Sequence, residues 1–213
     1  MALLYIILAV LAVLILVILA RTLAFRPGEQ KEEAPVPVDF DPQAAVDALG
    51  QLVRCKTVSF YDKSLEDEEE FQKLIALLPE LYPNVTENCP LIKLPDRGLL
   101  YRWQGREPGA AAVLMAHYDV VPVDEANWEK PAFEAIIEDG VMWGRGTLDT
   151  KVTFNGVLSA ANYLIGQGFQ PEKDIYFAFS GGEEINGQGA VNIVAYFTEH
   201  GIHPAIVVDE GGA

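Results

Sequence analysis

The chain has 213 residues, enough for one ordinary domain with appendages, and half of its residues are hydrophobic. Its formal net charge is −16, from 31 acidic and 15 basic residues. Such a chain lacks the basic face that binding to nucleic acid requires, so we exclude nucleic acid as a partner. The same acidity is compatible with a site that gathers divalent cations.

The N-terminal stretch 1–20 carries no charged side chain and is long enough to cross a bilayer as a helix. No Lys or Arg precedes it, which favours an uncleaved single-pass anchor over a signal peptide that releases a secreted protein. Arg21 and Arg26 follow the span, and the positive-inside tendency would keep that flank in the cytoplasm, but two charges leave the orientation ambiguous. We expect the domain that follows to lie outside the cytoplasm. Residues 21–40, rich in Pro, Glu and Val, are expected to be a linker, and residues 41–213 a globular domain.

Strands and helices alternate through the globular domain. Asp41 followed by Pro42 predicts a helix start, and apolar residues at helical spacing predict further helices over 65–81, 151–165 and 190–200. Short apolar or alternating runs predict strands over 91–94, 99–103, 111–116, 133–138, 174–180 and 205–208, with a hairpin turn at 139–140. This order indicates an α/β domain with a mostly parallel central sheet. The two cysteines are not at CxxC spacing, and buried thiols are favoured over a disulfide.

Acidic and imidazole side chains follow three of the predicted strands. The strand over 111–116 leads into His117 and Asp119, the strand over 174–180 into Glu183-Glu184, and the strand over 205–208 into Asp209. Ligands of parallel sheets gather at the carboxyl ends of the strands. Several carboxylates at one edge repel one another unless they are protonated or neutralised by a cation. We therefore predict a divalent metal site there.

The donor types indicate zinc or a similar cation. One imidazole nitrogen with carboxylate oxygens and no thiolate is a ligand set that zinc accepts. A lone histidine is more often a core residue, but Asp119 lies two positions after His117 and can accept its second ring N–H. Of Glu183-Glu184, one carboxylate can bind metal while the other accepts a proton; a solvated acidic turn is the alternative. Arg145 is expected to form an ion pair with one of these carboxylates, whereas His200 and His203 are weak candidates for ligands.

Four segments, LMAHYDVVPV, GRGTLDTK, FSGGEE and IVVDEGG, resemble in order and spacing the motifs of a family of co-catalytic zinc metallopeptidases. That family includes carboxypeptidase S, aminoacylase and glutamate carboxypeptidase, and the likeness is strongest to the carboxypeptidase S branch. It covers the chain from about Asp41 to the end. It implies a three-layer catalytic domain, two Zn²⁺ ions and hydrolysis of an amide bond next to a C-terminal amino acid.

The resemblance also implies roles for individual residues. His117 and Asp209 would hold one zinc and Glu184 the other, with Asp149 bridging the two beside a cis peptide bond. Glu183 would be the general base and acid, and Asp119 would assist catalysis by orienting His117. Thr150 departs from the acidic or amide residue that many relatives have after the bridging aspartate.

Two parts of the family pattern do not occur before Ala213: a late histidine for the second zinc, and a lid domain that binds the substrate carboxylate and the oxyanion. We therefore expect an N-terminal fragment that is inactive by itself, with a small molecule or peptide bearing a free carboxylate as substrate of the full-length protein. Dimerisation through the lid is a further expectation. An aminoacylase-like or diaminopimelate-pathway deacylase, and a non-catalytic membrane-anchored binding protein, are the alternatives.

Overall fold

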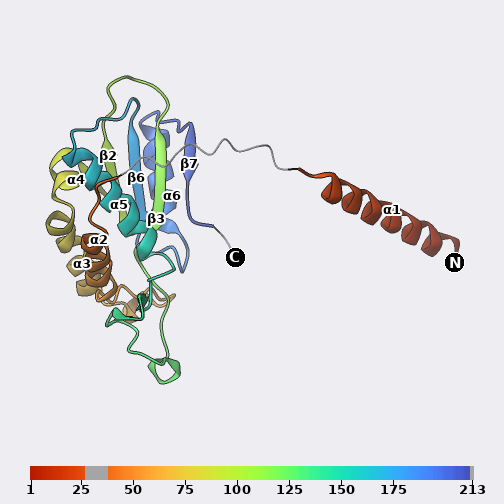
Figure 1. Cartoon of the computed structure of the whole chain (residues 1–213), viewed down its shortest axis with the longest axis horizontal. Coiled ribbons are helices and arrows are strands. Elements are labelled where there is room, and N and C mark those ends of the chain that lie inside the picture. Colours follow the sequence, from red (N-terminus) through yellow and green to blue (C-terminus); the bar gives the residue numbers. More distant parts are fainter. Residues whose placement is uncertain (27–37, 212–213) are drawn as a thin grey trace. The chain divides into compact units, whose positions relative to one another are not determined.

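The computed structural model describes residues 1–26 and 38–211, and the chain divides into two compact units, Met1–Asp39 and Phe40–Ala213. The first unit contains α1 (Ala2–Ala24), whose residues are all exposed (Figure 1). Its mean hydropathy of 3.4 and its 23 residues make it long and apolar enough to cross a membrane, a test that a signal sequence also passes. The helix runs four residues past the predicted span. Most of the predicted linker, residues 27–37, lies outside the described residues.

A five-stranded sheet with the order β1-β2-β6-β3-β7 forms the centre of the second unit (Figure 1). β3 pairs in parallel with β6 and with β7, whereas β1 with β2, and β2 with β6, are antiparallel. The predicted α/β class is confirmed, and the candidate residues lie at the parallel part of the sheet. The strands are β1 (Leu91–Leu94), β2 (Gly98–Trp103), β3 (Ala112–His117), β6 (Ile175–Ser180) and β7 (Ile206–Val208).

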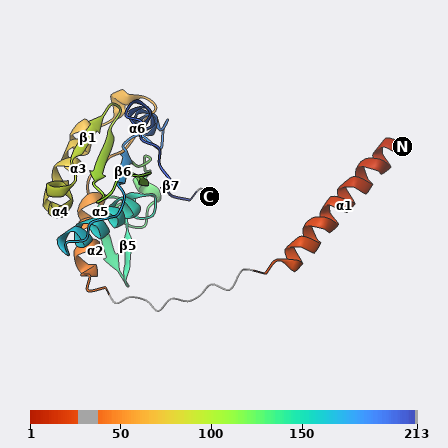
Figure 2. The same cartoon turned by 90° about the horizontal axis from the view of Figure 1, so that it is seen from above.

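Helices cover both faces of the sheet, which gives the three layers that the family resemblance implies (Figure 2). Alternate strand residues point to opposite faces, so Tyr101 and Phe177 pack on one side while Leu100 and Tyr176 pack on the other. The first face is covered by four helices: α2 (Pro42–Val53), α3 (Glu68–Leu81), α4 (Pro83–Asn88) and α5 (Lys151–Gly166). The second face is covered by α6 (Gln188–Glu199), through Ile193 and Phe197.

Aspartate caps set the first residues of α2 and α3. α2 begins at Pro42 as predicted, with the Asp41 carboxylate accepting the N–H of Gln43 at 2.9 Å. The next helix begins at Glu68 and not at 65, because the Asp67 carboxylate accepts the N–H of Glu69 at 3.1 Å and so caps it. A 3₁₀ turn, Lys63–Leu65, precedes it.

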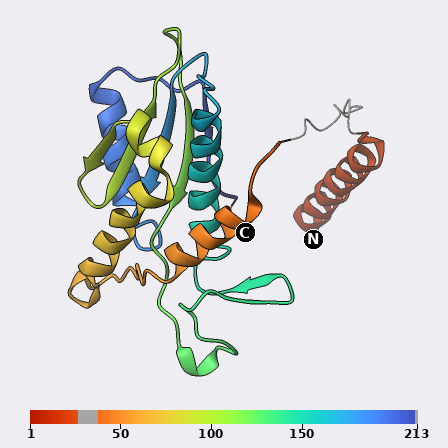
Figure 3. The ribbon, with the colours of Figure 1, turned by 60° about the vertical axis from the view of Figure 1, so that its left-hand side comes forward.

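The predicted strand over 133–138 is shorter than expected. Ala135 has a φ of 51°, which interrupts the extended backbone, so β4 (Ile136–Glu138) begins only after it. β4 pairs with β5 (Val141–Trp143) across a turn at Asp139 and Gly140, whose φ angles of 52° and 78° are typical of a tight hairpin. This hairpin projects from the end of the main sheet where β3 ends (Figure 3).

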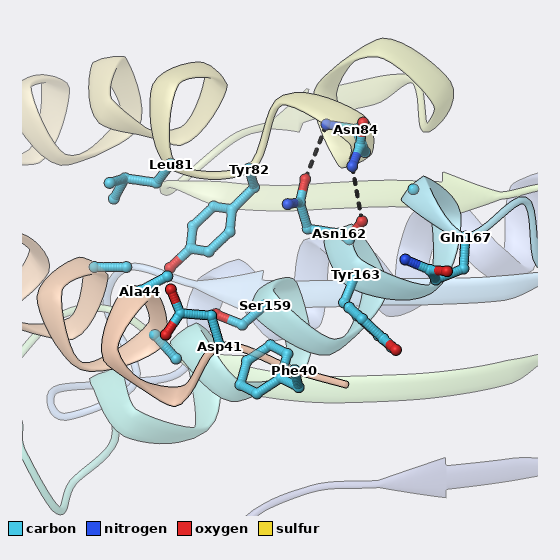
Figure 4. Close-up of a pocket in the computed structure, with 13 residues that line it drawn as sticks. Phe40, Asp41, Ala44, Leu81, Tyr82, Asn84, Ser159, Asn162, Tyr163 and Gln167 are labelled. Carbon is cyan, nitrogen blue, oxygen red and sulfur yellow. Dashed lines mark hydrogen bonds between the residues drawn. The ribbon is translucent and has the colours of Figure 1, made fainter. Parts of the chain in front are cut away.

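A cavity of about 310 Å³ lies between α2, α4 and α5 (Figure 4). Asn84 closes one side of it by donating its backbone N–H to the side chain of Asn162 at 2.8 Å and its amide group to the Asn162 carbonyl at 2.9 Å. Phe40 packs edge-on against Tyr163 on the other side. None of the candidate histidine or acidic residues lines this cavity, so it is separate from the candidate site.

Both cysteines are free and buried, as the sequence favours. Burial raises the pKa of the Cys89 thiol from 9.0 to about 11 and also raises the pKa of Cys55. The thiolate is the reactive form, and a rise of the pKa from 9.0 to about 11 makes the Cys89 thiolate roughly a hundredfold less abundant at neutral pH. We expect Cys89 of the folded chain to be alkylated at pH 8 roughly a hundredfold more slowly than in denaturant, and Cys55 to be slowed as well. Mass spectrometry would measure it, and a chain that takes up no label in denaturant without reductant would instead contain a disulfide.

Candidate metal centre

The three parallel strands bring the candidate residues to one edge of the sheet. His117 is the last residue of β3 and lies opposite Ser180, the last residue of β6. The Glu183-Glu184 turn follows β6, and Asp209 and Glu210 follow β7. The expected meeting of acidic and imidazole side chains at the carboxyl ends of the strands is therefore present in the fold.

His117 is only 2% exposed, and both of its ring nitrogens have acidic neighbours. Nε2 lies 2.9 Å from Oδ1 of Asp149. Nδ1 lies 3.0 Å from the main-chain carbonyl oxygen of Asp119 and 3.5 Å from its Oδ1. A ring held at Nδ1 in this way keeps Nε2 directed at Asp149. The contacts with Asp119 are on the ring edge where an orienting residue belongs, and the carbonyl is the nearer partner.

Two groups of side chains offer ligand atoms that lie within 4.8 Å of one another. The first is His117, Asp149 and Glu184, and the second is His117, Glu183 and Glu210. In the second group, Nε2 of His117 is 3.8 Å from Oε2 of Glu183 and 3.3 Å from Oε1 of Glu210. One imidazole and several carboxylates are donors that suit zinc and related divalent cations.

The charges of the cluster shift its titrating groups towards protonation. Burial would lower the pKa of His117, but the hydrogen bond and charge of Asp119 and the charges of Glu210 and Glu183 raise it to about 9 overall. Burial is the main cause that raises the pKa of Glu183 and of Glu184, and the neighbouring carboxylates raise both further. The carboxylates that favour a proton on His117 would favour a metal cation in the same way. The donor set fits a divalent cation.

Asp119 connects the histidine to the acidic turn. Its side chain is fully buried, and Oδ1 accepts the backbone N–H of Glu183 at 3.1 Å. Oδ2 accepts the backbone N–H of Glu184 at 3.2 Å and the hydroxyl of Ser59 at 2.6 Å. The same carboxylate therefore contacts the ring of His117 and fixes the backbone of the turn. No local sequence pattern points to Ser59, because its partner Asp119 is 60 residues away along the chain.

Asp149 lies just before α5, and the Asp149-Thr150 peptide bond is cis, as the family resemblance implies. The next residue, Lys151, is fully buried, and its ammonium donates to the carbonyl of Leu52 at 3.0 Å and of Cys55 at 2.6 Å. Burial lowers the pKa of Lys151 to about 7. These bonds tie the segment that presents Asp149 to the end of α2. No local sequence pattern points to this lysine, because its carbonyl partners are distant along the chain.

Three further residues from the sequence analysis have other partners in the fold. The Asp209 carboxylate accepts the N–H of Glu210 at 2.9 Å and belongs to neither ligand group; its neighbour Glu210 faces His117 instead. The expected ion pair of Arg145 is wrong for the described carboxylates: its guanidinium lies over the ring of Trp128, 5.3 Å from the centroid. His200 bonds to the Tyr196 carbonyl at 2.8 Å and stacks on its ring, which agrees with its weak candidacy.

Comparison with known proteins finds one matching family and many related chains. The model of Peptidase family M20/M25/M40 matches residues 113–213. The chain is 33% identical over 210 residues to "Probable carboxypeptidase S-like 2" of Dictyostelium discoideum, covering 93% of this chain and 40% of that protein. It is 32% identical over 216 residues to the human "N-fatty-acyl-amino acid synthase/hydrolase PM20D1", covering 97% and 42%. The chain thus spans about two fifths of the length of these relatives.

Solved structures show the same fold at lower sequence identity. Human carnosine dipeptidase 1 matches with a TM-score of 0.67 and 15% identity, over 80% of this chain and 38% of that one. The metallo-carboxypeptidase Sso-CP2 of Sulfolobus solfataricus matches with a TM-score of 0.62 and 22% identity, over 82% and 38%. These likenesses confirm the predicted three-layer α/β architecture.

Proposed function

The chain belongs to peptidase family M20/M25/M40, and on that premise and the site geometry we propose that it holds the metal-binding half of an amide-bond hydrolase. The bond cleaved would lie next to a C-terminal amino acid, as in a metallo-carboxypeptidase or an N-acyl-amino-acid hydrolase. The names of the relatives, carboxypeptidase S-like and N-fatty-acyl-amino acid synthase/hydrolase, support this choice.

The observation that carries the proposal is the group of His117, Asp149 and Glu184, whose ligand atoms lie within 4.8 Å of one another. His117 and Asp209 would hold one divalent cation and Glu184 the other, with Asp149 shared between them, and zinc is the ion we propose. When bound, the cations supply Lewis-acid activation of water and of the substrate carbonyl. Asp209 remains a proposed ligand through its family motif, and Glu210 is the nearer carboxylate to His117.

Glu183 is the residue we propose as general base and acid. Its side chain is half exposed, so it can reach a water molecule and a substrate, and its backbone N–H is held by Asp119. Burial and the neighbouring carboxylates raise its pKa, which brings the carboxyl closer to the neutral range where it can both accept and return a proton. Its oxygen would take the proton from the attacking water and pass it to the leaving amine.

The remaining parts of the proposal concern location and partners. Residues 1–20 would anchor the chain in a membrane, residues 21–40 would link the anchor to the domain, and the domain would lie outside the cytoplasm. A signal sequence in place of the anchor is the alternative, since α1 satisfies both. The substrate would carry a free carboxylate, and a homodimer is proposed for the whole protein.

Zinc binding by the 213-residue chain tests the proposal. We expect a saturable site, measured by competition with a chromophoric chelator, and at least about a hundredfold weaker binding in His117→Ala, because direct ligands matter more than their outer partners. His203→Ala is the matched control, since His203 is exposed and in neither ligand group. Weak binding that His117→Ala leaves unchanged would contradict the proposed centre. Turnover of dipeptides and N-acyl amino acids by the longest natural form, lost on chelation, would then separate an enzyme from a binding protein.

A further inference from the structure

We propose that Ser59 is a positioning residue of the metal centre, which acts through Asp119 on both His117 and the Glu183-Glu184 turn. The inference rests on the proposed function, because it gives Ser59 a role in metal binding. Ser59 is fully buried, and its hydroxyl donates to Oδ2 of Asp119 at 2.6 Å.

The backbone around Ser59 is fixed against the segment that follows β3. The Ser59 N–H donates to the Val120 carbonyl at 3.0 Å, and the Val120 N–H donates to the Thr57 carbonyl at 2.9 Å. Val58 and Val120 form a parallel bridge. The Thr57 hydroxyl also donates to the Tyr118 carbonyl. Ser59 is therefore held in place independently of the metal ligands, and its hydroxyl has a defined direction.

The Asp119 carboxylate has a specific set of partners. Two are the backbone N–H groups of Glu183 and Glu184, the proposed base and a proposed ligand. The third is the Ser59 hydroxyl, which belongs to the segment after α2 and not to the turn after β6. Without that hydroxyl, a fully buried carboxylate oxygen loses its shortest hydrogen bond. The carboxylate is then free to turn, and the ring of His117 and the acidic turn lose their common support.

Zinc affinity of the 213-residue chain, measured by chelator competition, is the first test. Removing an outer partner of a metal ligand typically weakens binding 10- to 100-fold; because Ser59 acts one bond further out, through Asp119, we expect a loss of about tenfold in Ser59→Ala. Ser59→Thr keeps the donor and should restore most of the affinity. Ser64→Ala is a matched control, because the exposed Ser64 hydroxyl donates to the Asp62 carboxylate at 2.7 Å away from the site. Its zinc affinity should equal that of the wild type.

Hydrogen exchange of the metal-free chain is the second test, and it does not depend on the proposed function. The amides of Glu183 and Glu184 should exchange about tenfold faster in Ser59→Ala than in the wild type, and at the wild-type rate in Ser64→Ala. If Ser59→Ala does not fold, Ser59→Cys, with a weaker donor of similar size, should give a smaller change in the same direction.

The outcomes separate the two proposals. A folded Ser59→Ala with wild-type zinc affinity and wild-type exchange would overturn the role of Ser59. Equal losses in Ser59→Ala and Ser59→Thr would overturn it as well, because the hydroxyl would then not be the cause. A wild-type chain without a zinc site, but with faster exchange in Ser59→Ala, would instead refute the metal centre and retain the structural link.

Discussion

Replacing Glu183 with Gln is expected to lower amide hydrolysis by about 10²–10⁴-fold, the usual contribution of general acid–base catalysis, and to leave zinc content unchanged. The substitution keeps the size of the side chain and the backbone N–H bond to Asp119, but it replaces the carboxylate, which can accept a proton, with an amide, which cannot. The turnover number is measured with the longest natural form that contains residues 1–213. Zinc content is measured in the same preparation.

Two further variants serve as comparisons, one at a proposed metal ligand and one away from the site. Glu184→Gln should lose zinc affinity, because Glu184 lies in the ligand group with His117 and Asp149. Glu134→Gln should change neither property, since Glu134 is exposed and outside both groups. If Glu183→Gln lost zinc and Glu184→Gln retained it, the two glutamates would have exchanged roles. If both kept full activity, neither would take part in the chemistry.

Local sequence patterns were sufficient to predict the main elements of the domain. Helix and strand periods, the cap at Asp41 and the turn at Asp139-Gly140 act over a few residues, and the structure agrees with them. The predicted bounds are wrong where a neighbouring residue favours a different backbone conformation. The cap at Asp67 shortens α3, and the backbone of Ala135 shortens β4. Neither the start of α3 nor the start of β4 follows from the spacing of apolar residues alone.

The candidate site was predictable to the level of strand ends, but not to the level of contacts. The rule that ligands gather at the carboxyl ends of parallel strands brings His117 and the Glu183-Glu184 turn together. It does not say which of Asp209 and Glu210 faces His117, because that depends on backbone angles after β7. Ser59 has no local signal, since its partner Asp119 is 60 residues away in the sequence.

Replacing Asp149 with Ala is expected to have the largest effect on metal binding. Asp149 lies 2.9 Å from Nε2 of His117, shares a ligand group with Glu184 and is the proposed bridge between two cations. We expect the loss of both zinc ions, with an affinity more than about a hundredfold weaker, which exceeds the usual effect of an outer partner. Isothermal titration with zinc and metal analysis of the purified variant would measure it.

The metal-free fold should tolerate this change, and that separates a ligand from a structural residue. The Asp149 side chain is 59% exposed, whereas Lys151 anchors the adjacent segment through the Leu52 and Cys55 carbonyls. The melting temperature of the apo variant should therefore stay within a few degrees of the wild type, as expected for a surface substitution of roughly 0.5 kcal/mol or less. Asp47→Ala, which removes an exposed carboxylate that accepts a hydrogen bond from Gln43 at 2.9 Å, is the matched control. An Asp149→Ala chain that kept both zinc ions would rule out the bridge, and one that unfolded without metal would assign Asp149 to the fold.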